Sequence, residues 1–341
     1  MDDPIRGGTA ASPLMRLYYW ALPSVRDWPG GAMAPSLYGF VLQASRREQV
    51  RLGLLTLVVF PLSLAPLELQ RKIVNYAVAH STVELLLALG ALYLAVLLLQ
   101  SALKFLRDAY LHRIAEGVTR LLRRRFVGCE PLDGVEPGAR QAIISAESEK
   151  VGGFTAESIS LPLLQAGTVL SIAAYMLLIE PLVAIVAIVF LVPSVVVVGL
   201  TQPILNGLSR SKITVVRSLG QAVLRGDGRD AATEAEAAGL VNRIYVLRLR
   251  FTNLKVATKS FNQLITGMGL LSILMVGGWL AIQDRTEIGI IVAFMSGYER
   301  MTGPARDLLN FYRRLSIMRV QYGLVADAFG SPASSDRQLP F

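Results

Sequence analysis

The sequence predicts an all-α membrane protein with six transmembrane helices and long helical extensions on the cytoplasmic side. The composition favours a membrane fold, because 53% of the 341 residues are hydrophobic and only 17% are charged, whereas soluble domains carry about 25% charged residues. Six apolar runs follow one another along the chain, each long enough to cross a hydrocarbon core about 30 Å thick. Lys and Arg gather almost entirely in the segments on one side of these runs.

The apolar runs are separated by connections of two very different lengths. The runs cover residues 52–76, 83–106, 158–179, 181–205, 261–283 and 287–309. Three connections are short turns, at residues 80–82, 180–181 and 284–286, and the two others run for about 50 residues and read largely as helix. If the helix of the third run begins near Gly138 and continues to Ile179, it reaches about 63 Å. Since the bilayer core holds only about half of that length, the rest is predicted to project into the cytoplasm.

The distribution of positive charge predicts the orientation of the chain. Of the 34 Lys and Arg residues, 28 lie in segments 1–51, 107–156, 206–260 and 310–341, whereas the other side receives only Arg71, Lys72 and Arg285. Loops rich in Lys and Arg stay in the cytoplasm. Both termini are therefore predicted to be cytoplasmic in a multi-pass protein of the cell membrane. The same rule explains the net charge of +9 without a nucleic-acid partner.

Residues 1–50 are predicted to form a cytoplasmic N-terminal region. Asp2 and Asp3 open the chain and no early apolar run follows them, so no cleavable signal peptide is expected. The apolar segment 37–42, followed by Arg46 and Arg47, predicts an amphipathic elbow helix that lies on the inner leaflet. A poorly ordered tail is the alternative for this region.

Several sequence motifs agree in order and spacing with one known family. Residues 286–294 read TEIGIIVAF and are followed by Tyr298 and by Gly303 and Pro304. Residues 123–126 read RRRF, and Gly138 is followed by Ser145 and Glu147. Over residues 50–328 the chain resembles the transmembrane domain of the type I ABC exporter family. The resemblance implies a six-helix transmembrane domain over 51–328, followed by a linker-like tail at 329–341.

The resemblance implies a function and partners that this chain would need. One such domain forms half of a translocation pathway, so a homodimer or a pair with a related transmembrane half is expected in the bilayer. The six lysines each follow a residue other than glycine, so the Gly-Lys pair of a phosphate-binding P-loop is absent. The chain is therefore expected to be no enzyme on its own and to hold no cofactor. ATP would be bound and hydrolysed by a separate subunit, or by a domain that is missing here.

Two inner loops are the places where the resemblance implies contact with that ATPase. The first contains Gly138 and Arg140, and the second contains Asp227, Arg229 and Asp230. Members of the family usually carry apolar and aromatic residues in the second loop, and residues 226–236 lack them. Since a coupling helix normally inserts an apolar side chain into a groove of its partner, docking through this loop is predicted to be weak, altered, lost, or mainly electrostatic.

Charged residues within the apolar runs are the candidates for the substrate pathway. Glu299, Gly303 and Arg306 share one face of the last run, because they follow one another at steps of four and three residues, and Asn310 and Arg313 continue this face. Alternatively, Glu299 pairs with a neighbour and the lower residues only mark the inner interface. In the first run, Glu68 and Asn75 share a face with Arg71 or Lys72 and are predicted to form an outer gate, a cavity wall or a simple interface anchor.

Other functional classes have little support in the sequence. Two histidines and one cysteine are too few for a closed zinc site, and no catalytic motif for hydrolysis or dinucleotide binding is present. Two rivals to the exporter half remain open. One is a carrier on the same fold that is driven by an ion gradient, with Glu299 as its proton site, and the other is a non-transporting membrane scaffold or regulator.

Overall fold

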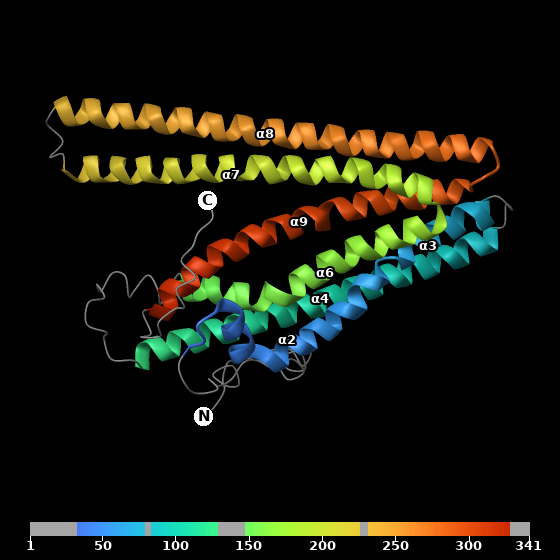
Figure 1. The fold of residues 1–341 in the computed structure, drawn as a ribbon, viewed down its shortest axis with the longest axis horizontal. Coiled ribbons are helices and arrows are strands. Elements are labelled where there is room, and N and C mark those ends of the chain that lie inside the picture. The colour runs from blue at the N-terminus through green and yellow to red at the C-terminus, as the bar shows by residue number, and fades with distance from the viewer. Residues whose placement is uncertain (1–32, 79–82, 129–146, 226–230, 328–341) are drawn as a thin grey trace. The chain divides into compact units, whose positions relative to one another are not determined.

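The computed structural model describes residues 33–78, 83–128, 147–225 and 231–327, and every regular element in these ranges is a helix. The helices are α2 (Leu37–Leu62), α3 (Ala65–Lys72), the π-helix η1 (Ile73–Val78), α4 (Val83–Gly128), α6 (Ser148–Ile179), α7 (Pro181–Arg225), α8 (Ala231–Ile282) and α9 (Ile288–Asp327) (Figure 1). The predicted all-α fold class is therefore confirmed over the described part of the chain.

Five helical segments are long and apolar enough to cross a bilayer, which indicates a multi-pass membrane protein. They are Leu37–Tyr76, Val83–Arg125, Ser148–Ile179, Pro181–Ala222 and Ala237–Ile282. Each contains one of the first five predicted runs, apart from one residue beyond Ile282. The sixth predicted run is helical, as part of α9, but it is not among the apolar candidate spans because Glu299 and Arg300 interrupt its apolar stretch.

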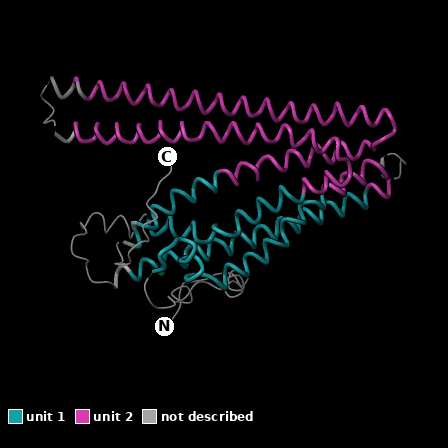
Figure 2. The backbone as a smooth tube through the Cα atoms, in the orientation of Figure 1, with its two compact units in different colours: residues 1–66, 87–171, 310–341 teal, residues 67–86, 172–309 magenta. Residues whose placement is uncertain are grey.

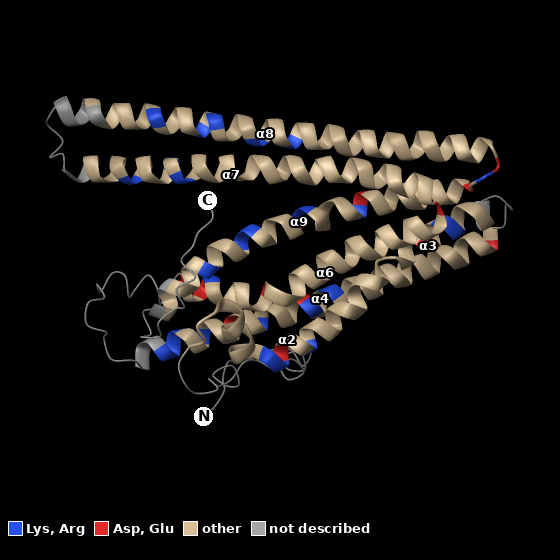
Figure 3. Cartoon of the chain, in the orientation of Figure 1, with Lys and Arg blue, Asp and Glu red and all other residues tan. Residues whose placement is uncertain are grey.

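Three helices extend far beyond the apolar runs, as predicted. α4, α7 and α8 contain 46, 45 and 52 residues, which correspond to about 69, 68 and 78 Å, more than twice the hydrocarbon thickness. The Lys and Arg of α7 all lie in the half next to residues 226–230, and those of α8 lie between Arg243 and Lys259 (Figure 3). The predicted helix start near Gly138 lies outside the described residues.

The short turns at two helix junctions form as predicted. α6 ends at Ile179 and α7 begins at Pro181, where proline is tolerated because the first helical N–H has no partner within the helix. α8 ends in a turn in which the Arg285 amide donates to the Leu280 carbonyl over 3.0 Å. Asp284 takes φ 56° there, a left-handed conformation that Asp tolerates better than most residues. The turn at 80–82 lies outside the described residues.

The predicted elbow is a helix, but its apolar face is buried in protein. α2 begins behind Ser36, whose Oγ accepts a hydrogen bond from the Gly39 amide over 3.1 Å, and it bends at Ser45, where φ is −148°. Leu37, Phe40 and Val41 are buried. These three side chains are therefore covered by protein, whereas Leu42 of the same helix is 49% exposed. The position of the elbow on the inner leaflet stays a prediction.

The chain divides into two compact units, residues 1–66, 87–171 and 310–341 in one, and residues 67–86 and 172–309 in the other (Figure 2). The first unit has a continuous apolar core that α2, α4, α6 and α9 supply. Phe40 packs on Tyr322 with ring centroids 5.2 Å apart, and Phe154 stacks on Phe311 at 5.7 Å. Burial raises the pKa of Tyr322, so its hydroxyl remains a donor, here to the Ala34 carbonyl.

The second unit contains α7 and α8 as a long antiparallel pair (Figure 1). A buried hydrogen bond joins the two helices within their apolar halves, where the Ser194 hydroxyl donates to Asn262 Oδ1 over 2.6 Å. Polar pairs of this kind stabilise contacts between helices in lipid, because the alternative is an unsatisfied group in hydrocarbon. Long apolar side chains cover much of the remaining surface of the pair.

Candidate functional site

A network of polar side chains joins three helices of the second unit, and Glu68 lies at its centre. Glu68 and Arg71 are three residues apart on α3 and therefore share a face. Arg71 Nε donates to Glu68 Oε2 over 2.9 Å and Arg71 Nη2 donates to Glu68 Oε1 over 2.7 Å. This two-point contact is the strongest geometry that a guanidinium and a carboxylate form. Lys72 is the weaker neighbour, with Nζ 3.8 Å from Glu68 Oε1.

Tyr175 brings α6 into the network. Its hydroxyl donates to Glu68 Oε2 over 2.9 Å, so Glu68 accepts three hydrogen bonds from two different helices. The Glu68 side chain is 31% exposed and that of Arg71 is 21% exposed. Partial burial of this kind makes each polar contact matter, because water replaces only part of any bond that is lost.

Asn75 and Glu287 connect the network to the beginning of α9. Asn75 Nδ2 donates to Glu287 Oε2, and Arg71 Nη1 lies 3.4 Å from the same oxygen. Asn75 Oδ1 accepts a hydrogen bond from the Gly289 amide over 2.7 Å, which satisfies one of the N–H groups that a helix leaves free in its first turn. We call these seven residues the Glu68 cluster: Glu68, Arg71, Lys72, Asn75, Tyr175, Glu287 and Gly289.

The packing around the cluster leaves no room for a side chain at Gly289. A Cβ atom there would approach the Arg71 carbonyl oxygen to 2.5 Å and would also clash with Asn75 Oδ1. A second close approach lies further along α9, where the Tyr298 ring meets Gly269 of α8, and a Cβ at Gly269 would lie 2.5 Å from Tyr298 Cζ. Gly289 and Tyr298 of the motif at 286–304 therefore act in helix packing.

The predicted polar face of α9 has a different character from the Glu68 cluster. Glu299 is exposed, and its carboxylate makes no hydrogen bond or ion pair with the residues that the structure describes. Gly303 has open space where a Cβ would stand. Arg306 is half-buried and its Nε donates to the Thr302 carbonyl over 3.0 Å. The alternative in which Glu299 pairs with a neighbour therefore finds no partner within the described ranges.

The structure thus brings some of the predicted site residues together and separates others. Glu68 and Asn75 belong to one cluster, whereas Glu299, Gly303 and Arg306 lie further along α9. The docking residues Gly138, Arg140, Asp227, Arg229 and Asp230 lie outside the described residues. Within the described part, no group of His, Cys, Asp and Glu is arranged to hold a metal ion.

Sequence reasoning missed two members of the Glu68 cluster, Tyr175 and Glu287. Tyr175 reads as an ordinary apolar-run residue, and Glu287 is separated from Asn75 by 212 residues. A signal was available for Glu287, because it is an acidic residue at the same predicted membrane side as Arg71. Opposite charges at one level of neighbouring spans favour a pair.

Comparison with models of known protein families and with curated proteins finds no match to this chain.

Proposed function

We propose that this chain is the transmembrane subunit of an ABC-type exporter and forms one half of a translocation pathway. Two halves, either identical or related, would enclose the pathway, and an ATP-hydrolysing subunit or domain outside this chain would supply the work. The sequence motifs at 123–126 and 286–304 support this assignment, as do helices that continue for about 30 Å or more beyond the bilayer core.

The position of Glu299 is the observation that carries the proposal. We place α9 across the membrane as the sixth span, and Glu299 then lies 11 residues into it, about 17 Å from its start and close to the middle of the hydrocarbon core. An exposed carboxylate at this depth is costly against lipid and is expected to face a polar cavity. One half alone does not enclose such a cavity, so a second half has to complete it.

The Glu68 cluster would close the outer end of this half. Its residues come from the end of the first span, the end of the third and the start of the last, and the charge bias assigns all three ends to the outer side. Their contact in space is consistent with that topology. A network of ion pairs and hydrogen bonds that joins three helix ends can be broken and remade as a unit, which suits a gate in a protein that alternates between two states.

A carrier driven by a proton gradient is the second candidate, and the same exposed Glu299 favours it. In that mechanism Glu299 would bind and release the proton, so Glu299→Gln and a proton uncoupler would both abolish transport. In an ATPase-driven exporter the uncoupler has little direct effect, whereas substitution of Asp227, Arg229 and Asp230 would uncouple the ATPase. Transport that is sensitive to the uncoupler and independent of a partner would favour the carrier.

Accessibility of position 299 to a water-soluble reagent tests whether α9 lines a polar pathway. Cys129 is the only cysteine, so Cys129→Ser provides a background without thiols. Leu94 is a matched control, because it lies 11 residues into α4 and is 58% exposed on an apolar surface. In membranes, Glu299→Cys should react with a charged methanethiosulfonate reagent and Leu94→Cys should not. Equal protection of both positions would contradict the proposed pathway.

A further inference from the structure

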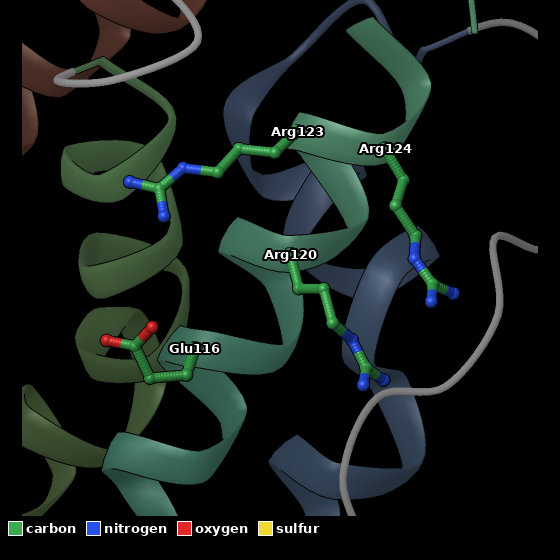
Figure 4. A pocket seen from close by; sticks show the side chains of 4 residues that line it. All are labelled: Glu116, Arg120, Arg123 and Arg124. Atoms are coloured by element: carbon green, nitrogen blue, oxygen red, sulfur yellow. The ribbon is translucent and has the colours of Figure 1, made fainter. Parts of the chain in front are cut away.

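A cavity of about 360 Å³ lies on the part of α4 beyond its apolar run, and its described lining consists of charged side chains only. These are Glu116, Arg120, Arg123 and Arg124 (Figure 4). Its volume is at the lower end of the range for small-molecule sites. Arg123 and Arg124 belong to the motif at 123–126, but the proposed transport function gives none of these four side chains a role.

The face of α4 opposite these side chains packs into the core of the first unit. Ile114, Val118 and Leu122 lie on the opposite face of α4 and are fully buried in the core of the first unit. The packing of these three residues therefore fixes the backbone of α4 from Ile114 to Leu122. Guanidinium groups on such a scaffold lose less freedom on binding than those on a loop, because only their side chains have to be ordered.

Arg120 and Arg124 form the basic end of the cavity. They are four residues apart, so they lie one above the other on the helix surface, and both extend toward the same side of α4 (Figure 4). Arg124 is exposed and forms no ion pair with the described residues. Arg123 extends to the other side, where its Nη2 lies 3.6 Å from Glu149 Oε2 of α6. Glu116 also extends to that side.

The charges and the shape of these groups define the class of ligand. The guanidinium groups of Arg120 and Arg124 are one helical turn apart, and each can donate two hydrogen bonds. A phosphate group has enough oxygens to accept all of them, whereas a single carboxylate has only two oxygens. Glu116, on the other side of the helix, adds a negative charge that weakens the binding of an anion without preventing it. We propose that Arg120 and Arg124 bind the phosphate group of a small anion on the side that the charge bias assigns to the cytoplasm.

The depth of the cavity decides between a soluble anion and a lipid headgroup. The apolar run of α4 ends near Leu106, so Arg120 and Arg124 lie about 21 and 27 Å further along the helix. A typical tilt of about 20° shortens this distance only slightly. Lipid headgroups extend only about 7 Å beyond the hydrocarbon, and charges are screened over about 8 Å at physiological ionic strength. The phosphate group therefore belongs to a soluble molecule.

Titration of the full-length chain in mild detergent with inorganic pyrophosphate tests this site. Arg120→Gln combined with Arg124→Gln should raise the dissociation constant about tenfold or more, because each removes charge-assisted hydrogen bonds. Arg125→Gln is the matched control, since it removes the same charge from the same helix outside the cavity, and it should change the constant less than about threefold. Glu116→Gln should tighten binding a few-fold by removing repulsion, a gain that misfolding cannot mimic.

Nanodiscs provide the second arm of the test. A ligand that binds the folded chain raises its thermal stability. In nanodiscs, the unfolding temperature should rise when pyrophosphate is added, and it should not rise when phosphatidylglycerol replaces part of the phosphatidylcholine. Stabilisation by phosphatidylglycerol alone, lost in the double Arg variant, would overturn the assignment to a soluble molecule. Absence of saturable pyrophosphate binding to the folded chain, or equal loss in Arg125→Gln, would overturn the site itself.

Discussion

At the scale of single residues, the Glu68 carboxylate combines three hydrogen bonds in one place. Two come from Arg71 on its own helix and one comes from Tyr175 on α6. Hydrogen bonds to charged groups contribute about 1.5–3 kcal/mol each before solvent screening is considered, whereas neutral ones contribute about 1 kcal/mol. The partly buried Glu68 side chain should therefore contribute to stability far more than a typical surface ion pair.

Glu68→Gln should lower the free energy of unfolding by about 1–2 kcal/mol, because the neutral amide accepts fewer and weaker hydrogen bonds. Lys72→Ala is the control, since its ammonium is 3.8 Å from Glu68 and its side chain is 46% exposed, and it should cost about 0.5 kcal/mol or less. Reversible unfolding in mixed micelles measures both. Equal effects of the two substitutions would contradict a central role for Glu68.

Gly289→Ala should destabilise the protein by about 1–3 kcal/mol, because the added Cβ meets the Arg71 carbonyl oxygen, which is backbone and cannot move aside cheaply. Gly278→Ala is the matched control, since a Cβ there meets nothing within 4 Å. It should leave stability unchanged or raise it by up to about 1 kcal/mol. Unfolding transitions of both variants in the same micelles provide the comparison, and a neutral Gly289→Ala would contradict the close approach.

At the scale of elements, the first residues of α2 bury part of their apolar surface in protein. Phe40 and Val41 are fully buried, whereas Leu42 beside them is 49% exposed. The elbow packs on α4, α6 and the end of α9 within the core of the first unit. Its position is therefore set by protein contacts, chiefly those of Phe40 with Tyr322.

Phe40→Ala should lower the free energy of unfolding by about 3–4 kcal/mol, the usual cost of a large cavity in a core. Leu42→Ala should cost about 1 kcal/mol or less, because half of that side chain remains exposed. Measurements in detergent and in nanodiscs should agree. If Leu42→Ala had the larger effect, and only in nanodiscs, the elbow would lie on the membrane after all.

Hydropathy predicted the first five apolar helices well, because a helix that faces lipid needs about 20 consecutive apolar residues. Pro181 and the turn at Asp284 marked two helix ends directly. The signal is weaker for α9, where Glu299 and Arg300 lower the mean hydropathy, so its place as a sixth span stays a prediction. Hydropathy also does not distinguish burial in lipid from burial in protein, and the burial of Phe40 and Val41 could therefore not be predicted. The contact of Asn75 with Glu287 was also hidden, because it depends on how distant segments pack.

At the scale of the whole molecule, the charge bias, the length of the helices and the exposed carboxylate of Glu299 support one account. The chain would span the membrane with its long helical extensions in the cytoplasm and would supply one wall of a polar pathway. The Glu68 cluster would lie at the outer end of that wall. Each part of this account depends on orientation, which a labelling experiment can test directly.

Impermeant thiol reagents should leave Cys129 unmodified in intact cells and modify it once the cells are permeabilised, because the first inner loop is predicted to be cytoplasmic. The native chain can be labelled without further substitution, since it has one cysteine. Cys129→Ser is the negative control for labelling. Modification of Cys129 from outside intact cells would reverse the topology and would remove the support for the exporter half.

Native mass spectrometry of the tagged chain, purified from its own host in a mild detergent, tests the central claim most directly. An exporter half predicts a particle with two transmembrane halves and an ATP-hydrolysing subunit, and it predicts that the separated chain alone hydrolyses no ATP. A complex of this composition, with ATPase activity that disappears when the partner is removed, is the expected result. A strictly monomeric chain without a second half or an ATPase would contradict the account.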